Sequence, residues 1–228
     1  MSNTDACVTG CKTAKCGDTF LQMDVETCDD GNIIPLDGCS AMCKLENSAV
    51  GMADGMNKAI PDNGYNGTKA SMACVDIPVA KAGIVTGATL KVAMAHTWVG
   101  DLTLKLYSPA DAKVLTLMSR PGVLEVADDG VDFSGESANL EVATPVTYRD
   151  GGAKDAEKMG DTLLNSSDVV CKTDNQCDYF TNPGKGPGVK FTDFAGVQAM
   201  GTWTFCAGDS VGTDTGSIGL VTLTLFLQ

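Results

Sequence analysis

Ten cysteines constrain this chain of 228 residues more than any other feature. Six of them fall within the first 46 residues, a stretch too short to bury much apolar surface without cross-links. An even number of cysteines crowded at one end is typical of disulfides formed in an oxidising compartment. We therefore predict that all ten are paired, in a protein that is secreted or displayed at the cell surface. The ten are Cys7, Cys11, Cys16, Cys28, Cys39, Cys43, Cys74, Cys171, Cys177 and Cys206.

A zinc site is the alternative use of clustered cysteines. Zinc modules usually pair two C-x-x-C motifs, or one such motif with two histidines. No C-x-x-C motif occurs here, and the single histidine, His96, lies far from the cluster. Disulfides are therefore favoured. Cys171 and Cys177 close a short loop and are expected to pair, which leaves Cys74 for Cys206. The spacing of the six N-terminal cysteines does not choose their partners.

Charge and composition exclude several classes of function. Acidic residues outnumber basic ones by 29 to 16, which gives a formal net charge of −13. Such a chain repels the phosphate backbone, so nucleic-acid binding is not expected. Hydrophobic residues make up 43% of the chain, enough for a core, but no apolar run is long enough for a membrane-spanning helix. If the protein is secreted, we expect its signal peptide to be absent from this sequence.

The chain divides into two parts in composition. Residues 1–46 form an acidic, disulfide-rich module. Residues 47–58, with the sequence NSAVGMADGMNK, contain small residues and glycines with little periodicity, and we interpret them as a linker. Residues 59–228 form the second domain.

The second domain has the alternating pattern of β-strands. Apolar and polar residues alternate in several short runs, which is typical of strands with one buried face. Glycine and proline clusters separate these runs, and at most one turn of helix is expected, at residues 155–160. An all-β sandwich or jelly roll is therefore expected. The clearest predicted strands are residues 88–95, 101–107, 114–118, 201–206 and 220–228.

Four motifs in this domain occur in an order that identifies a family resemblance. They are IPDNG at 60–64, AHTWVGDLTLKLYSPADAKVLTLMSRPG at 95–122, FTDFAG at 191–196 and GTWTFCAGDSVGTDTGSIGLVTLTL at 201–225. Together they resemble the P domain (Homo B domain) that follows the catalytic domain of kexin- and furin-type proprotein convertases. The resemblance implies an eight-stranded jelly-roll β-sandwich. Residues 123–190 depart from the pattern and look like an insertion.

The N-terminal module carries a second resemblance. Its sequence CGDTFLQMDVETCDDGNIIPLDGCSAMC, at 16–43, is similar to a cysteine-rich repeat of secreted bacterial proteins. More distantly it resembles the Lin-12/Notch repeat, a disulfide-rich unit folded around one Ca²⁺. The likeness implies a small acidic module held by disulfides and calcium.

Acidic loops in both parts predict calcium sites. Ca²⁺ takes six to eight oxygen ligands from carboxylates, amides and backbone carbonyls. Carboxylates crowded into a small cross-linked loop repel one another unless a cation lies among them, and the loops of a jelly roll gather at the ends of the sandwich. The EF-hand pattern is not met, because its closing glutamate is missing. The candidate ligands are Asp29, Asp30, Asn32 and Asp37 in the module, and Asp62, Asp101, Asp128, Asp132, Asp209 and Asp214 in the second domain.

Catalysis is not expected. A serine hydrolase needs a base, usually histidine, and His96 lies in the P-domain motif without a G-x-S-x-G sequence elsewhere. The zinc-peptidase motif H-E-x-x-H is also absent. A carboxylate pair among Asp128, Asp129 and Asp132 would suit a glycosidase, but aromatic residues are only 6% of the chain. Trp98 is expected to plug the end of the sandwich rather than to bind a partner.

These observations favour a non-catalytic, secreted, calcium-binding structural or adhesive protein, such as a surface, matrix or fibre subunit. Its expected partners are further copies of itself or another extracellular protein. The alternative is an accessory P domain of a secreted subtilase-type serine protease, and a small independent hydrolase is a third class. The sequence does not name a ligand, a partner or an oligomeric state.

Overall fold

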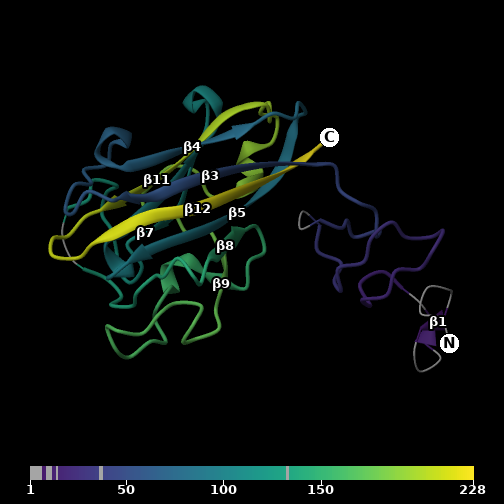
Figure 1. Ribbon diagram of the computed structural model, residues 1–228, viewed down its shortest axis with the longest axis horizontal. Helices are drawn as coiled ribbons and strands as arrows, with labels where there is room; N and C mark the ends of the chain where they lie inside the picture. Colours follow the sequence, from purple (N-terminus) through teal and green to yellow (C-terminus); the bar gives the residue numbers. More distant parts are fainter. Residues whose placement is uncertain (1–6, 9–11, 14, 36–37, 132–133) are drawn as a thin grey trace.

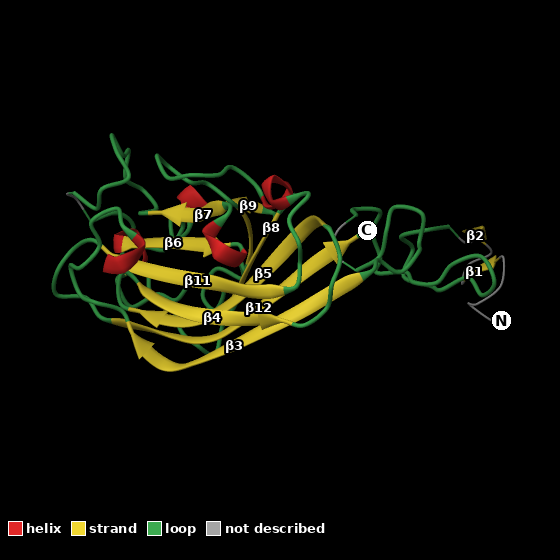
Figure 2. Cartoon of the chain, turned by 90° about the horizontal axis from the view of Figure 1, so that it is seen from above, coloured by secondary structure: helices red, strands yellow, loops and turns green. Residues whose placement is uncertain are grey.

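Two β-sheets pack face to face into a sandwich, and a small disulfide-bonded module precedes them (Figures 1 and 2). The computed structural model describes residues 7–8, 12–13, 15–35, 38–131 and 134–228. Within these residues no helix has the length and apolar character needed to cross a membrane.

The regular elements are nearly all strands. The strands are β1 (Cys7–Val8), β2 (Lys12–Thr13), β3 (Ser48–Ala59), β4 (Ala73–Val79), β5 (Val85–His96), β6 (Leu102–Tyr107), β7 (Val114–Ser119), β8 (Val146–Arg149), β9 (Lys154–Asp155), β10 (Asp178–Phe180), β11 (Gly201–Asp209) and β12 (Gly216–Leu227). Short 3₁₀ turns join some of them, namely η1 (Lys69–Ser71), η2 (Val99–Asp101), η3 (Pro109–Asp111), η4 (Ala156–Lys158) and η5 (Phe191–Phe194).

The order of the strands is that of a jelly roll. The larger sheet runs β3-β12-β5-β8-β10-β9 and the smaller sheet runs β4-β11-β6-β7. Without the short strands β9 and β10, eight strands remain, four in each sheet. Counted 1 to 8 along the chain, these lie in the orders 1-8-3-6 and 2-7-4-5, which is the jelly-roll arrangement. The predicted all-β, eight-stranded sandwich is therefore confirmed.

The core lies between the two sheets. Leu90, Leu104 and Leu223 point into it from β5, β6 and β12, and each is fully buried. Phe194 packs edge-on against Trp203, with their ring centroids 5.0 Å apart. Burying one such side chain contributes about 1.5–3 kcal/mol, so alternating strands on two facing sheets supply most of the driving force for folding.

The linker prediction for residues 47–58 is wrong, because this stretch forms the edge strand β3, paired along β12. Its inward-facing residues include Ala49, Gly51 and Ala53, so the alternation is between small and large residues rather than between apolar and polar ones. The small residues are needed because β3 crosses close to β4. A Cβ atom on Gly51 would lie 2.8 Å from a methyl group of Ile77. The sandwich therefore begins with β3.

The other predicted elements are present. The five predicted strands correspond to β5, β6, β7, β11 and β12, with Asp101 and Gln228 lying just outside them. The expected turn of helix is the 3₁₀ turn η4, but the prediction of at most one turn is wrong, because η1, η2, η3 and η5 are present as well. The insertion-like segment 123–190 supplies β8, β9 and β10, of which β10 runs parallel to both neighbours. Arg149 holds β8 to β10 through two hydrogen bonds of 2.8 Å to the carboxylate of Asp178.

Four disulfides are present among the described residues. The sandwich contains Cys74–Cys206, which joins neighbouring strands β4 and β11, and Cys171–Cys177, which closes a loop; both pairs agree with the sequence prediction. In the N-terminal module Cys16 pairs with Cys43 and Cys28 with Cys39. The side chains of Cys7 and Cys11 lie outside the described residues.

Candidate metal centre

Two loops that are far apart in sequence meet at one end of the smaller sheet. Asp101 ends η2 immediately before β6, and Asp209 ends β11. The antiparallel register places Asp209 opposite Leu102, and the N–H of Ser210 donates to the carbonyl oxygen of Asp101 at 3.0 Å. The fold therefore brings together two of the predicted calcium ligands, as expected for loops at the end of a jelly roll.

The carboxylate of Asp101 is fully buried but only half satisfied. Ser134 Oγ donates to its Oδ1 at 2.6 Å, whereas its Oδ2 has no hydrogen-bond partner among the described residues. Burial raises the pKa of Asp101 to about 6, and the negative charges of Asp209 and Asp214 act in the same direction. Above that pH the group carries a buried charge with an unpartnered oxygen, which is unfavourable unless a cation lies nearby.

Asp209 is held by the single histidine of the chain. His96 Nε2 lies 3.2 Å from Asp209 Oδ2, and the N–H of Val211 donates to the other carboxylate oxygen at 3.1 Å. The second ring nitrogen of His96 lies 2.8 Å from the carbonyl oxygen of Trp98. His96 is 1% exposed and Asp209 is fully buried. The histidine therefore fixes the aspartate in place and has no free face for a substrate.

Further oxygen atoms lie around these groups. Thr97 Oγ1 donates to Asp214 Oδ1 at 2.9 Å, and the N–H of Thr213 donates to Asp62 Oδ2 at 3.4 Å. Asp214 is half-buried and Asp62 is exposed, so both belong to the rim of the site. The hydroxyl of Ser210 is buried without a hydrogen-bond partner among the described residues. Together these residues form the candidate metal centre.

Asp128, another of the predicted ligands, already has partners for its carboxylate. Tyr65 donates to Asp128 Oδ1 and Lys105 donates to Asp128 Oδ2, each at 2.5 Å, so both oxygens of Asp128 have protein partners. Asp132 lies outside the described residues. We therefore leave Asp128 out of the candidate metal centre.

The acids of the N-terminal module cap the backbone. Asp29 accepts hydrogen bonds from four N–H groups, those of residues 17, 18, 19 and 31, and these bonds lower its pKa although burial opposes them. Asp30 Oδ1 accepts from the N–H of Asn32, whose own side chain accepts from Ile34. Asp37 lies outside the described residues. A carboxylate that already accepts four hydrogen bonds has little capacity left for a metal ion.

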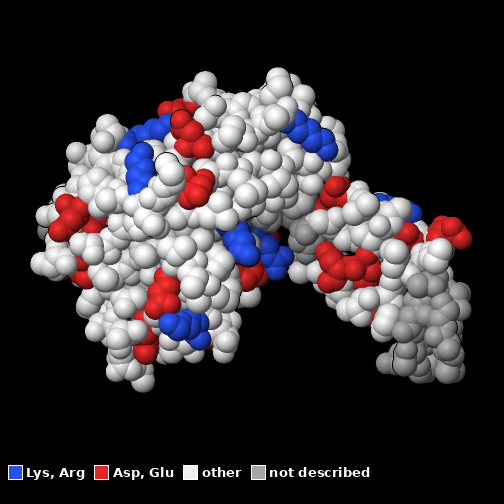
Figure 3. Space-filling model, in the orientation of Figure 1, with Lys and Arg blue, Asp and Glu red and all other residues white. Residues whose placement is uncertain are grey.

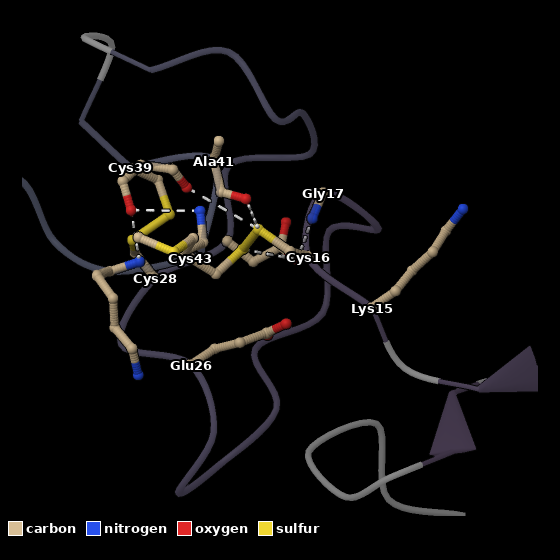
Figure 4. Close-up of a disulfide and its surroundings, with 12 residues drawn as sticks. Lys15, Cys16, Gly17, Glu26, Cys28, Cys39, Ala41 and Cys43 are labelled. Carbon is tan, nitrogen blue, oxygen red and sulfur yellow. Dashed lines mark hydrogen bonds between the residues drawn. A yellow bond between two sulfur atoms is a disulfide. The ribbon is translucent and has the colours of Figure 1, made fainter.

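One compact group of potential ligands occurs in this module. Glu26, Asp29 and Cys43 place ligand atoms within 4.8 Å of one another, the one such group of three among the described residues. However, the sulfur of Cys43 is bonded to Cys16 (Figure 4). Glu26 Oε2 accepts from the N–H of Gln22. The disulfides and backbone hydrogen bonds account for this cluster without a metal ion.

The sequence did not reveal the hydroxyl groups of the centre. Ser134 and Ser210 lie beside the acids only after folding, and Ser134 belongs to the segment where the P-domain resemblance lapses. The adjacency of Ser210 to Asp209 was the one available signal. Trp98 is half-buried and its Nε1 donates to the carbonyl oxygen of Gly135 at 3.2 Å.

Comparisons with known proteins identify no family. No family model matches the chain, and no curated protein matches it in sequence. Its fold is that of a disulfide-bonded jelly-roll sandwich. Among solved structures it is similar to the serine protease of Aeromonas sobria in complex with its chaperone, at 14% identity and a TM-score of 0.43, covering 78% of this chain and 26% of that one.

The serine protease of Aeromonas sobria on its own gives a similar result. The identity is 14% and the TM-score 0.42, over 81% of this chain and 28% of the protease. This chain therefore spans about a quarter of the length of the proteases it matches. A likeness at this level supports no statement about function.

Proposed function

We propose that the protein is a secreted, non-catalytic structural or adhesive module whose sandwich is stabilised by calcium bound at the candidate metal centre. The observation that carries the proposal is the fully buried Asp101 carboxylate, with Oδ2 unpartnered among the described residues and Asp209 and Asp214 nearby. A cation beside this oxygen would offset the buried negative charge.

The chemistry of the available donors suits calcium. They are carboxylate and hydroxyl oxygens, which hard cations prefer. No three carboxylates lie close enough together, among the described residues here, to form a ready-made cage. Ca²⁺ accepts irregular shells completed by carbonyl oxygens and water, whereas Mg²⁺ demands tight octahedral geometry. Asp101 would be the central ligand, with the hydroxyl of Ser210 and the rim residues Asp214 and Asp62 completing the shell.

Two further observations support a structural rather than a catalytic role. His96, the sole histidine, is buried with its two ring nitrogens beside Asp209 and Trp98, so a substrate would not reach it. Four disulfides cross-link the described residues, a feature of proteins that persist in an oxidising extracellular space. Acidic and basic side chains are interspersed over the face shown in Figure 3.

The second candidate function is an accessory domain of a secreted subtilase-type protease. The observation that favours it is the stretch AHTWVGDLTLKLYSPADAKVLTLMSRPG, which resembles the P domain and forms part of the candidate metal centre. A protease catalytic domain encoded in the same precursor would support this reading. Its absence would leave the structural role as the better one.

The experiment is a calcium titration of the purified protein and of the Asp101→Asn variant. Asn keeps the shape of the side chain but removes its charge. We expect wild-type protein to bind Ca²⁺ in isothermal titration calorimetry and the variant to bind at least tenfold more weakly. The matched control is Asp76→Asn, an exposed carboxylate on β4 of the same sheet, which should bind like wild type. Equal affinities for wild type and Asp101→Asn would refute the site.

A further inference from the structure

A buried lysine and aspartate lie in contact on the outer face of the smaller sheet. Lys105 is in the middle of β6, with its side chain only 3% exposed, and its Nζ lies 2.5 Å from Asp128 Oδ2. The carboxylate of Asp128 is 16% exposed and belongs to the loop that covers this face. A buried lysine is rare, and its amine is here aimed at one carboxyl group.

The carboxyl group is held rigidly in front of the amine. Tyr65 donates its hydroxyl to Asp128 Oδ1 at 2.5 Å. The loop around Asp128 also packs directly on the backbone of the Tyr65 loop. A Cβ atom on Gly67 would lie 2.4 Å from the carbonyl oxygen of Asp128, and one on Gly130 would lie 2.2 Å from that of Tyr65. Contacts this close require glycine on both sides and leave the aspartate little freedom to move.

A small buried cluster lies beside the pair. Tyr65, Met72, Tyr107 and Cys206 form a separate buried cluster on this face. The Nζ atom of Lys105 lies 5.3 Å from the centre of the Tyr65 ring. Burial of the lysine side chain keeps most water away from the amine, so the facing carboxyl group is its close neighbour.

We propose that Lys105 and Asp128 become joined by an intramolecular amide bond. Lys105 passes a proton to Asp128 Oδ2, and the neutral amine attacks the carboxyl carbon. The C–N bond forms, the C–Oδ2 bond breaks, and that oxygen leaves as one molecule of water after taking a second proton from the nitrogen. No oxidant, reductant or cofactor is required.

Tyr65 would assist this reaction. Its hydroxyl is aimed at Asp128 Oδ1, the oxygen on which negative charge develops when the amine adds to the carboxyl carbon. Close contact between the amine and the carboxyl group also accelerates the reaction, because a fixed geometry replaces a bimolecular encounter. The partial exposure of Asp128 leaves the departing water a way out.

The bond would tie the covering loop to the middle of the smaller sheet. It would act alongside the Cys74–Cys206 disulfide of the same sheet, but unlike the disulfide it would resist reduction. This inference does not depend on calcium, since Asp128 is not part of the candidate metal centre.

The test is the intact mass of the full chain after complete reduction and denaturation, both freshly purified and after prolonged incubation in the folded state. We expect a mass lower by one water molecule than that of the linear sequence. Proteolysis should yield a branched peptide that joins the segments containing Lys105 and Asp128.

Two variants locate the reaction. Lys105→Arg keeps a positive charge but has no amine that condenses, so its mass should equal that of its linear sequence. Tyr65→Phe keeps both reacting groups and should form the bond at least tenfold more slowly. If wild-type protein keeps the full linear mass after incubation, and the Lys105 amine reacts with an acylating reagent once the chain is unfolded, the pair is an ion pair only and the proposal is wrong. Because the wild-type mass decides, poor folding of either variant does not affect the conclusion.

Discussion

The backbone N–H of Ser210 donates to the carbonyl oxygen of Asp101 at 3.0 Å and so ties the loop after β11 to the turn before β6. This bond continues the antiparallel ladder that places Asp209 opposite Leu102. The register of two central strands, β6 and β11, therefore fixes where Asp101 and Asp209 lie relative to each other. Any change that disturbs the packing of His96 or Asp209 should therefore also shift the position of Asp101.

The buried pair of His96 and Asp209 should be important for stability. Replacing His96 by alanine removes a hydrogen-bond partner of a fully buried carboxylate, so we expect the free energy of unfolding to fall by about 3 kcal/mol. Urea denaturation measures this change. Lys91→Ala, at an exposed position of the same strand, is the control and should stay within about 0.5 kcal/mol of wild type. If His96→Ala changes the free energy of unfolding as little as the control does, the buried carboxylate of Asp209 does not need its contact with His96.

The two disulfides of the sandwich should contribute unequally. Cys74–Cys206 spans 132 positions of the chain and Cys171–Cys177 spans 6. In the chain-entropy model the longer loop stabilises by about 5 kcal/mol and the shorter by about 2 kcal/mol. We expect the paired serine variant at 74 and 206 to lose much more stability in urea denaturation than the one at 171 and 177. Equal losses would mean that native-state packing, not loop length, sets the contribution.

The sequence predicted the sandwich well because its long strands carry a clear alternation of apolar and polar residues, as in the run Leu102–Tyr107. It failed for β3, whose inward positions are occupied by alanine and glycine. In a single sequence, alanine and glycine without a clear alternation suggest a loop. Their place in a strand depends on how closely β4 approaches β3. The close approach of Ile77 explains the glycine at position 51.

Strand β3 should be essential for folding of the sandwich. It covers one edge of β12 along most of its length. A chain of residues 47–228 should show a cooperative melt, whereas a chain of residues 59–228 should aggregate or remain unfolded because β12 and the core lose their cover. Circular dichroism during heating distinguishes them. A cooperative melt of the shorter chain would show that β3 is dispensable.

Glu157 should make stability depend on pH. Burial raises its pKa from 4.5 to about 7, and Glu125 and Asp155 add to the effect. Between these values the folded protein holds a proton that the unfolded chain releases, so the contribution of Glu157 to the free energy of unfolding falls as the pH rises.

Replacing Glu157 by glutamine removes this dependence. Between pH 4.5 and about 7, the free energy of unfolding of the variant should rise by about 1–2 kcal/mol relative to that of wild type. This magnitude allows for the partial solvent exposure of Glu157. Urea denaturation below and above the window measures the gain. A constant difference between the two proteins across the window would contradict the predicted titration.

The candidate metal centre was only partly visible in the sequence. Asp101 and Asp209 were identifiable because each lies at the end of a recognisable strand motif. The environment of Asp128 and Asp29 was not, since the partners that occupy their oxygens come from distant segments such as Lys105 and Gly17. Acidic composition alone does not separate a carboxylate that caps the backbone from one that is left unpartnered in the interior.

The most direct test of the proposed calcium-stabilised sandwich is the melting temperature of residues 47–228 in EDTA and in excess Ca²⁺. This chain lacks the N-terminal module, so any effect arises from the sandwich. A ligand at a hundredfold excess over its Kd stabilises by about 2.7 kcal/mol, and a clear upward shift is therefore expected, smaller with Mg²⁺ and lost in Asp101→Asn. Identical melting temperatures in EDTA and Ca²⁺ would contradict the proposal and leave Asp101 as a buried acid without a cation.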